Sequence, residues 1–360
     1  DYPDYEKTVQ HIIGPKYIGV GHYINEYGVP VHRLAISNRL KKLTGRIWLK
    51  KFKQKVFELK PDLIISHGIF TFQSIRLAYW AHKLGCPIVY DDHTTINLIR
   101  KTLPSRFVFW AFRTLFSRKI MKSASKLVGI SATCIDVMRD NFGMIGNKVS
   151  MIPLGTDTDI FKKDENLRKD YRKNYLSIDE DINTLVVVYT GKIYEDKNVH
   201  LIMEALNEIN LDSTKDILIH IVGDIADSYK EKFEESIVAS KYKVIYKKAI
   251  PIIDLPAVYN AADIAVWPDH LTNSTIDASA CGCPIICSEY MPERVSYENG
   301  LLVKAGHKGD LKEKLAYILN NNALRAQMGA NGIRYVEEQL SWKAIAKQFL
   351  SLNHTTDHFV

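Results

Sequence analysis

Long hydrophobic runs are missing from this sequence, and cysteines are few. No stretch of 18 or more apolar residues occurs among the 360 residues, so no membrane-spanning helix is predicted. The chain opens with DYPDYEKTVQ, which is polar and acidic, so we expect no secretory signal peptide there. The five cysteines have no regular spacing, and the Cys281-x-Cys283 pair lacks the second pair that would complete a zinc site. These absences favour a protein of the reducing cytoplasm without a disulfide framework.

Length and composition predict a globular protein with two cores. Hydrophobic residues make up 46% of the chain and charged residues 25%, as in typical globular proteins. A chain of 360 residues exceeds the usual size of a single hydrophobic core, so two domains are expected.

The net charge of +7 comes largely from two basic stretches. Residues 39–55 contain eight lysines and arginines and no acid, and a second basic stretch covers residues 113–126. Such patches attract nucleic acid, anionic lipid or phosphorylated small molecules, although either could also be an ordinary solvated helix face. We expect anionic lipid or phosphorylated ligands here, and no nucleic acid.

Strand-like apolar runs alternate with helical periodicity along most of the chain. The alternation covers residues 61–155, stops in the charge-dense segment 163–183, and restarts at residue 184. Strand–helix alternation is typical of a parallel sheet with crossover helices. The sequence therefore predicts an α/β fold with two Rossmann-like domains, which we place at residues 1–165 and 184–340, with segment 163–183 as their connection.

Two carboxylates lie eight residues apart in the stretch WPDHLTNSTIDASACGCPII. Asp269 ends a strand-like run, and Asp277 lies one turn into a probable helix that opens with Asn273, Ser274 and Thr275. A helix start offers unpaired backbone N–H groups to a phosphate, and the flanking carboxylates can accept hydrogen bonds from sugar hydroxyls. This pattern fits a nucleotide diphosphate sugar. The alternative is a capping box made by Ser274 and Asp277, which needs no ligand.

A second candidate binding segment, TGKIYEDKN, follows a predicted strand with the five apolar residues LVVVY. Gly191, Lys192 and Lys197 lie in the loop at the carboxyl end of that strand, where ligands of open α/β sheets bind. Two ammonium groups can neutralise a diphosphate and stabilise it as a leaving group, so no metal is required. An exposed loop with ordinary lysines is the alternative reading.

Several segments together resemble the retaining glycosyltransferases of family four, also called group 1. The two aspartates stand where that family has Glu-x7-Glu, and Gly191-Lys192 with Lys197 resembles its G-[RK]…K-G pattern, with Asn198 in place of the second glycine. Further resemblance lies in PDLIISHG, VSMIPLGTDTDIF, PERVSYENGLLV and LSWKAIAKQFL. The resemblance implies the GT-B fold, two Rossmann-like domains facing a cleft, with a C-terminal helix at about 341–360 that joins the first domain. Only 27 residues precede the segment GVPVHRL, so the first domain is expected to lack its N-terminal elements.

The resemblance also implies an activity and residue roles. We expect a metal-independent hexosyltransferase that moves a sugar from a nucleotide diphosphate sugar to a hydroxyl acceptor, without a further cofactor. The residues expected at the reacting groups are His93, Lys192, Lys197 and Asp269. The residues expected to bind the donor are Gly191, Asn273, Ser274, Thr275 and Asp277. A histidine at the place of His93 could instead be structural or merely exposed.

Aromatic and basic residues share the segment PSRFVFWAFRTLFSRKIMKSA at positions 104–124. Such a mixture suits a membrane interface, while a buried crossover helix with a basic outer face is the alternative. Trp48, Phe52 and Val56 repeat the combination. These segments favour a lipid-linked or cell-envelope glycan acceptor and peripheral contact with an anionic membrane. A phosphorylase or epimerase of the same fold, or a non-catalytic protein that binds nucleotide sugars, remain alternative functions.

Overall fold

The computed structural model describes residues 19–25, 27–39, 47–94, 102–178, 183–210 and 216–352. Within them the chain divides into two compact units. The N-terminal unit contains residues 19–153 and 347–352, and the C-terminal unit contains residues 154–346. No described helix is long and apolar enough to cross a lipid bilayer.

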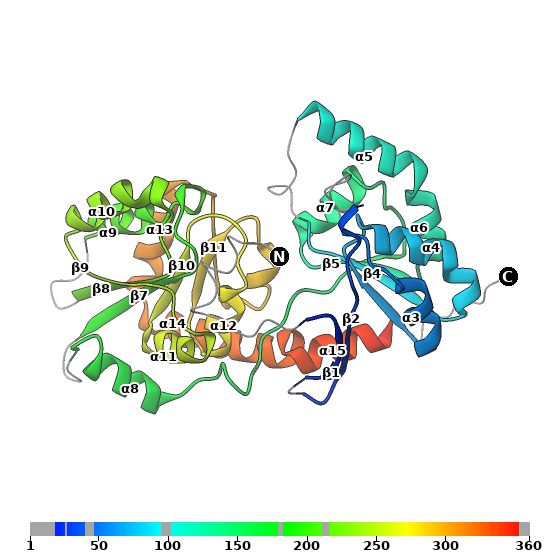
Figure 1. Cartoon of the computed structure of the whole chain (residues 1–360). Coiled ribbons are helices and arrows are strands. Elements are labelled where there is room, and N and C mark those ends of the chain that lie inside the picture. The colour runs from blue at the N-terminus through cyan, green and yellow to red at the C-terminus, as the bar shows by residue number, and fades with distance from the viewer. Residues whose placement is uncertain are drawn as a thin grey trace. The chain divides into compact units, whose positions relative to one another are not determined.

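The N-terminal unit is built on a parallel four-stranded sheet (Figure 1). Its strands, which neighbour one another in chain order, are β3 (Ile64–His67), β4 (Ile88–Asp92), β5 (Lys126–Gly129) and β6 (Val149–Met151). The connecting helices are α4 (Phe72–Leu84), α5 (Leu103–Leu115), α6 (Ser117–Ser123) and α7 (Ala132–Asp140). The unit also contains an antiparallel hairpin of β1 (Gly21–Ile24) and β2 (Pro30–Arg33), and helix α3 (Phe52–Leu59). The strand order does not reverse among these described strands, so they form one half of a doubly wound arrangement.

The C-terminal unit contains a parallel six-stranded sheet in the order β12-β11-β10-β7-β8-β9. The strands are β7 (Thr184–Thr190), β8 (Asp216–Val222), β9 (Lys243–Lys247), β10 (Ile264–Trp267), β11 (Ile285–Ser288) and β12 (Gly300–Val303). The helices are α8 (Glu165–Asn174), α9 (His200–Asn207), α10 (Lys230–Val238), α11 (Leu255–Ala261), α12 (Ser274–Ala280), α13 (Lys308–Leu319) and α14 (Asn322–Tyr335). The chain runs outward from β7 to β9, returns to β10, and then runs outward in the opposite direction to β12. The strand order therefore reverses between β7 and β10.

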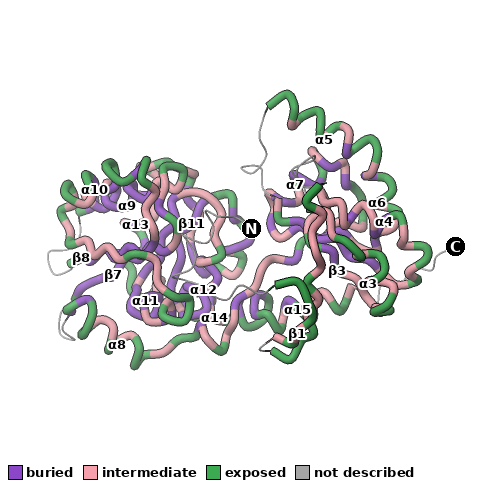
Figure 2. The backbone as a smooth tube through the Cα atoms, in the orientation of Figure 1, coloured by how far each residue is buried: buried purple, intermediate pink, exposed green. Residues whose placement is uncertain are grey.

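Burial explains why the strands of the C-terminal unit read as continuous apolar runs. Every residue of β7 and β10 is buried (Figure 2). Helices cover both faces of such a sheet, so each side chain of a central strand packs against a helix layer. The predicted α/β class with two Rossmann-like domains is confirmed.

Local sequence sets the ends of the helices. Thr71 precedes α4 and its side chain accepts the Ser74 N–H, while Ser131 does the same for Cys134 at the start of α7. Gly85 ends α4 in the left-handed conformation, with φ of 67°, which glycine adopts without steric cost. These caps satisfy backbone groups that the first and last turns leave open.

The segment expected as a plain connection, residues 163–183, contains helix α8 and belongs to the C-terminal unit. The prediction of a plain linker was therefore wrong. The helix was missed because its residues are mostly polar and show no apolar stripe. Asp164 caps the helix by accepting N–H bonds from Asn166 and Leu167. Arg168 and Arg172 anchor it, since their guanidinium groups lie 2.6 Å and 2.5 Å from the Asp263 carboxylate.

We expect Asp263→Ala to destabilise the protein strongly. The Asp263 carboxylate also accepts the Val186 N–H at 2.7 Å, so its removal leaves two half-buried guanidinium groups and one strand N–H without this acceptor. Breaking a buried ion pair from one side costs about 3–5 kcal/mol. Chemical denaturation should show a loss in the lower part of that range. The exposed Asp170→Ala on the same helix is the control and should cost less than about 1 kcal/mol. Equal losses would contradict the anchoring role.

Candidate functional site

The candidate site of the C-terminal unit lies where the strand order reverses. Gly191 directly follows β7, and Asp269 follows β10 after one proline. These two strands are paired, Ile264 with Val187 and Ala265 with Val188, so their loops leave the same edge of the sheet. At such a switch point the two loops diverge, and ligands of open α/β sheets bind in the crevice between them.

Gly191 lies in a crowded turn that requires glycine. Its φ is 131°, and its N–H donates to the Val222 carbonyl at 2.9 Å. The neighbouring loop also needs a glycine, because a Cβ on Gly223 would lie 1.7 Å from the Gly191 carbonyl oxygen. The loops after β7 and β8 are therefore pressed backbone to backbone, which fixes the peptide of Gly191 at the switch point.

Lys197 ties the loop after β7 to the loop after β10. Its Nζ donates to the Leu271 carbonyl at 3.0 Å. Burial lowers the pKa of Lys197 to about 8, although the nearby Asp269 and Asp196 carboxylates oppose the shift. The positive charge of Lys192 lowers it further. Lys192 itself is exposed, so the two predicted lysines are near enough to interact but differ in burial.

Asn198 and Asp269 form a second tie between the same loops. Asn198 has a left-handed backbone with φ of 51°, which explains why a glycine would also suit this position. Its Nδ2 donates to Asp269 Oδ2 at 3.0 Å, and the His270 N–H donates to Asp269 Oδ1 at 2.6 Å. Both oxygens of the short carboxylate are thus held in place.

The segment with Asn273, Ser274 and Thr275 forms the start of α12. Asn273 is the exposed N-cap residue, without a side-chain capping bond, and Ser274 is already helical. The alternative of a capping box with Ser274 as N-cap is therefore wrong. The Ser274 N–H points to Thr272 Oγ1 at 3.3 Å, and the buried Thr275 donates its hydroxyl to the Thr272 carbonyl at 3.0 Å.

Asp277 lies in a different environment from Asp269. Its Oδ1 accepts the Thr156 hydroxyl at 2.5 Å. Burial raises the pKa of Asp277 to about 6, while the Thr156 hydrogen bond and the positive charge of Arg294 oppose the shift. Thr156 is held in turn, because its N–H donates to the Leu340 carbonyl and its own carbonyl accepts the Trp342 N–H.

Sequence reasoning did not assign roles to Asn198, Thr156 and Arg294, which surround the two aspartates. Arg294 is 5% exposed, its Nε lies 3.9 Å from Glu293 Oε1, and its charge acts on Asp277. The replacement of a glycine by Asn198 was the one available signal for a side-chain contact. Thr156 and Arg294 gave no signal, because the hydrogen bond of Thr156 to Asp277 and the effect of the Arg294 charge on Asp277 join separate parts of the chain.

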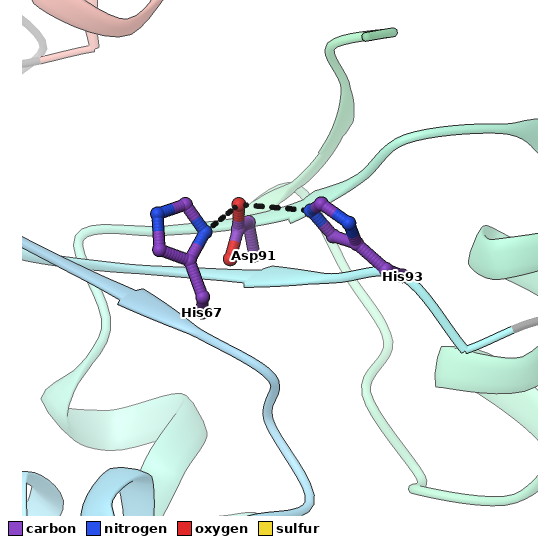
Figure 3. Close-up of side chains that lie close together, drawn as sticks. All are labelled: His67, Asp91 and His93. Carbon is purple, nitrogen blue, oxygen red and sulfur yellow. Dashed lines mark hydrogen bonds and ion pairs between the residues drawn. The ribbon is translucent and has the colours of Figure 1, made fainter. Parts of the chain in front are cut away.

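His93 belongs to the N-terminal unit and lies just beyond β4. Its Nε2 is 3.3 Å from Asp91 Oδ2, and His67 Nδ1 is 2.6 Å from the same oxygen (Figure 3). The hydrogen bond to Asp91 raises the pKa of His67, against the effect of burial. The next acid, Asp92, accepts the backbone N–H groups of Ile69 and Thr94, so its role is to hold the strand end.

Two units of parallel sheet, one of them doubly wound with lysines and an acid at its switch point, define a protein of the GT-B class. The family described as "Glycosyl transferases group 1" matches residues 168–335, and the one described as "Glycosyltransferase Family 4" matches residues 10–160. The chain belongs to these group 1, family 4 glycosyltransferases.

Known relatives are distant in sequence. An uncharacterised glycosyltransferase of Methanocaldococcus jannaschii is 24% identical, over 82% of this chain and 75% of the relative. A GDP-mannose-dependent alpha-(1-6)-phosphatidylinositol monomannoside mannosyltransferase of Mycolicibacterium smegmatis is 26% identical, over 53% of this chain and 52% of the relative. Among solved structures, Anabaena HepE in complex with UDP and glucose is 16% identical and superposes with a TM-score of 0.63, over 87% of this chain and 82% of HepE. The last comparison shows the same fold.

We expect Asp277→Asn to stabilise the protein above pH 6. A carboxyl whose pKa is raised on folding binds more protons in the native state, so its ionisation lowers the free energy of unfolding as pH rises from about 4 to about 6. An asparagine keeps an oxygen for the Thr156 hydroxyl but carries no charge. The gain should be about 1–3 kcal/mol at pH 8 and should vanish below about pH 4.

Thermal unfolding of both proteins across this pH range is the measurement. Asp170→Asn, which removes an exposed carboxylate, controls for the loss of one surface charge. A difference between wild type and Asp277→Asn that does not change with pH would mean that Asp277 is not a buried ionised group.

Proposed function

We propose that this glycosyltransferase binds a nucleotide diphosphate sugar in its C-terminal unit and transfers the sugar with retention of configuration to a hydroxyl acceptor. The observation that carries the proposal is the convergence of Lys197, Asn198 and Asp269 at the strand-order switch point. A cation and a fixed carboxylate side by side suit a ligand with both phosphates and sugar hydroxyls.

The predicted site residues of the C-terminal unit bind different parts of the nucleotide diphosphate sugar. Lys192 and Lys197 neutralise the diphosphate and stabilise it as a leaving group, helped by backbone N–H groups at Gly191 and at Asn273, Ser274 and Thr275. Asp269 accepts hydrogen bonds from the transferred sugar, and Asp277 accepts them from the ribose. The leaving phosphate takes up the proton of the acceptor hydroxyl, so no protein nucleophile is assigned.

A panel of nucleotide diphosphate sugars tests the donor. The full chain is screened by thermal shift with uridine, guanosine and adenosine diphosphate sugars, and nucleotide release is then measured with and without acceptor extract. Binding of one donor with acceptor-dependent release supports the proposal. Binding without release in any extract would favour a non-catalytic nucleotide-sugar protein. Failure of every donor to bind would contradict the proposed site.

We expect the affinity for nucleoside diphosphate to fall as pH rises through 8. The pKa of Lys197 is about 8, and a bound diphosphate requires the protonated ammonium. Between pH 7 and pH 9 the protonated fraction of such a group falls about tenfold, so the dissociation constant should rise about tenfold. Calorimetry with uridine and guanosine diphosphates measures this.

Two variants separate Lys197 from other titrating groups. Lys197→Met should bind more weakly at pH 7, with little further loss by pH 9, whereas Lys197→Arg should keep its charge throughout and lose the pH dependence. If both variants retain the wild-type pH profile, Lys197 does not contact the diphosphate.

We further propose a lipid-linked acceptor. Helix α5 leaves one apolar face open, on which Leu103, Phe107 and Trp110 are 78%, 65% and 60% exposed. Exposed basic side chains accompany that face at Arg106 and Arg113. Such a face suits an anionic membrane interface. The name of the Mycolicibacterium relative includes a phosphatidylinositol acceptor, which supports the same class of acceptor.

The aromatic residues of these segments are not all available for this role. Phe109 packs against Phe70 at 5.1 Å between ring centroids, and Phe112 is buried in the same cluster. In the other segment, Phe52 and Val56 pack into the core, and Trp48 lies against the Arg76 guanidinium at 4.4 Å. Phe107 and Trp110 are therefore the residues to test. The other segment offers the exposed lysines Lys51, just before α3, and Lys53 in α3.

We expect the protein to float with anionic vesicles and to be released by salt. Each lysine or arginine near an anionic surface contributes about 1 kcal/mol, so neutral vesicles should bind poorly. Replacing Phe107 and Trp110 with serine should weaken flotation at least about tenfold, since each inserted ring contributes roughly 1.5–3 kcal/mol. The melting temperature should stay unchanged because both rings are exposed.

Tyr317→Ser, at a 57% exposed aromatic residue on α13, is the matched control and should float like the wild type. Undiminished flotation of the double variant would exclude insertion by α5. A wild-type protein that never floats would point to a water-soluble acceptor.

A further inference from the structure

Three potential metal ligands come together at the carboxyl ends of two neighbouring strands of the N-terminal unit. His67 ends β3 and pairs with Asp91 of β4, and His93 follows two residues later. One ligand atom of each residue lies within 4.8 Å of the other two. Figure 3 shows both imidazole rings directed at the Asp91 carboxylate from opposite sides. The planes of the two rings are 84° apart.

The set of atoms is one that divalent transition metals prefer. Two imidazole nitrogens and one carboxylate oxygen bind zinc at about 2.0–2.2 Å, and three protein ligands leave a position for water or for a hydroxyl group. Ligand atoms of a tetrahedral zinc site are about 3.4 Å apart, as follows from those bond lengths. The distance of 3.3 Å between His93 Nε2 and Asp91 Oδ2 already fits.

His67 and Asp91 lie too close together for two ligands of one zinc ion, so the His67 ring must move slightly. His67 Nδ1 lies 2.6 Å from Asp91 Oδ2, which is a hydrogen bond rather than a spacing between two ligands of one ion. The His67 side chain is 74% exposed, so its ring can rotate outward by the roughly 0.8 Å that zinc requires. Binding would then replace the shared proton with the metal, as metal binding to protonated ligands generally does.

The charge at the centre of the cluster also favours a cation. Asp91 is 2% exposed, and its Oδ1 has no hydrogen-bond partner among the described residues. The neighbouring Asp92 provides the contrast, because backbone N–H groups satisfy both of its oxygens. The two imidazoles bond only Oδ2, so the buried Oδ1 of Asp91 keeps an unused acceptor capacity that a cation near the cluster would satisfy.

We propose that His67, Asp91 and His93 bind one divalent transition metal ion of the zinc type. The site is made of residues of the N-terminal unit alone and does not depend on the lysines proposed to hold the diphosphate. A metal held here engages His93 through Nε2 and keeps a coordination position for a water molecule.

Metal titration of the full chain tests the proposal. Untagged protein is stripped with a chelator and titrated with Zn²⁺ by calorimetry, and with Co²⁺ while its visible absorption is followed. One equivalent of each ion should bind, and Co²⁺ should give the spectrum of a site with nitrogen and oxygen ligands. Asp91→Asn and His67→Gln should each weaken Zn²⁺ binding at least about tenfold.

His82→Gln is the matched control, since His82 is an exposed histidine on α4 of the same unit. It should bind Zn²⁺ like the wild type. His67→Gln changes an exposed ring, so it keeps the test valid even if the buried Asp91→Asn fails to fold. Absence of a saturable single equivalent would overturn the proposal, as would Zn²⁺ affinity that is unchanged in both variants. The cluster would then be a hydrogen-bonded triad that only orients His93.

Discussion

The reversal of strand order between β7 and β10 is the constraint on which the candidate donor site depends. Because the chain winds outward in opposite directions from these paired strands, the loops that follow them separate at one edge of the sheet. Two side-chain bonds then join the loops again, from Lys197 to Leu271 and from Asn198 to Asp269. The loops diverge because of the topology, and their polar groups are held in place by these bonds.

Strand β10 has an aspartate near each end, and the two serve different purposes. Asp263, before the strand, gathers two arginines and a strand N–H, so its charge is compensated within the protein. Among the described residues, Asp269, after the strand, accepts hydrogen bonds from the Asn198 amide and the His270 N–H, which leaves lone pairs for a ligand. At β10 the acid before the strand is therefore neutralised within the protein, and the acid after it can still accept hydrogen bonds from a ligand.

Much of the fold followed from sequence because the strands are buried on both faces and read as apolar runs between helices. The ten parallel strands of the two sheets lie where the alternation predicted them. Helix α8 was missed because arginine contacts, which leave no apolar stripe, hold it in place. The inward and outward faces of α5 could not be assigned because the helix carries aromatic residues on both. The bonds that organise the site join residues 71 and 121 positions apart, and no local pattern encodes such pairs.

Thr156 links Asp277 to the segment around Ser341 by hydrogen bonds of its side chain and backbone. The chain enters the C-terminal unit at Leu154 and leaves it after Ala346, and Thr156 pairs with Ser341 between these two passages. The turn before Ser341, Val336–Leu340, is a π-helix, a rare geometry that is frequent at functional sites. The same threonine holds Asp277 through its hydroxyl. The position of the Asp277 carboxylate therefore depends, through the single side chain of Thr156, on both passages of the chain.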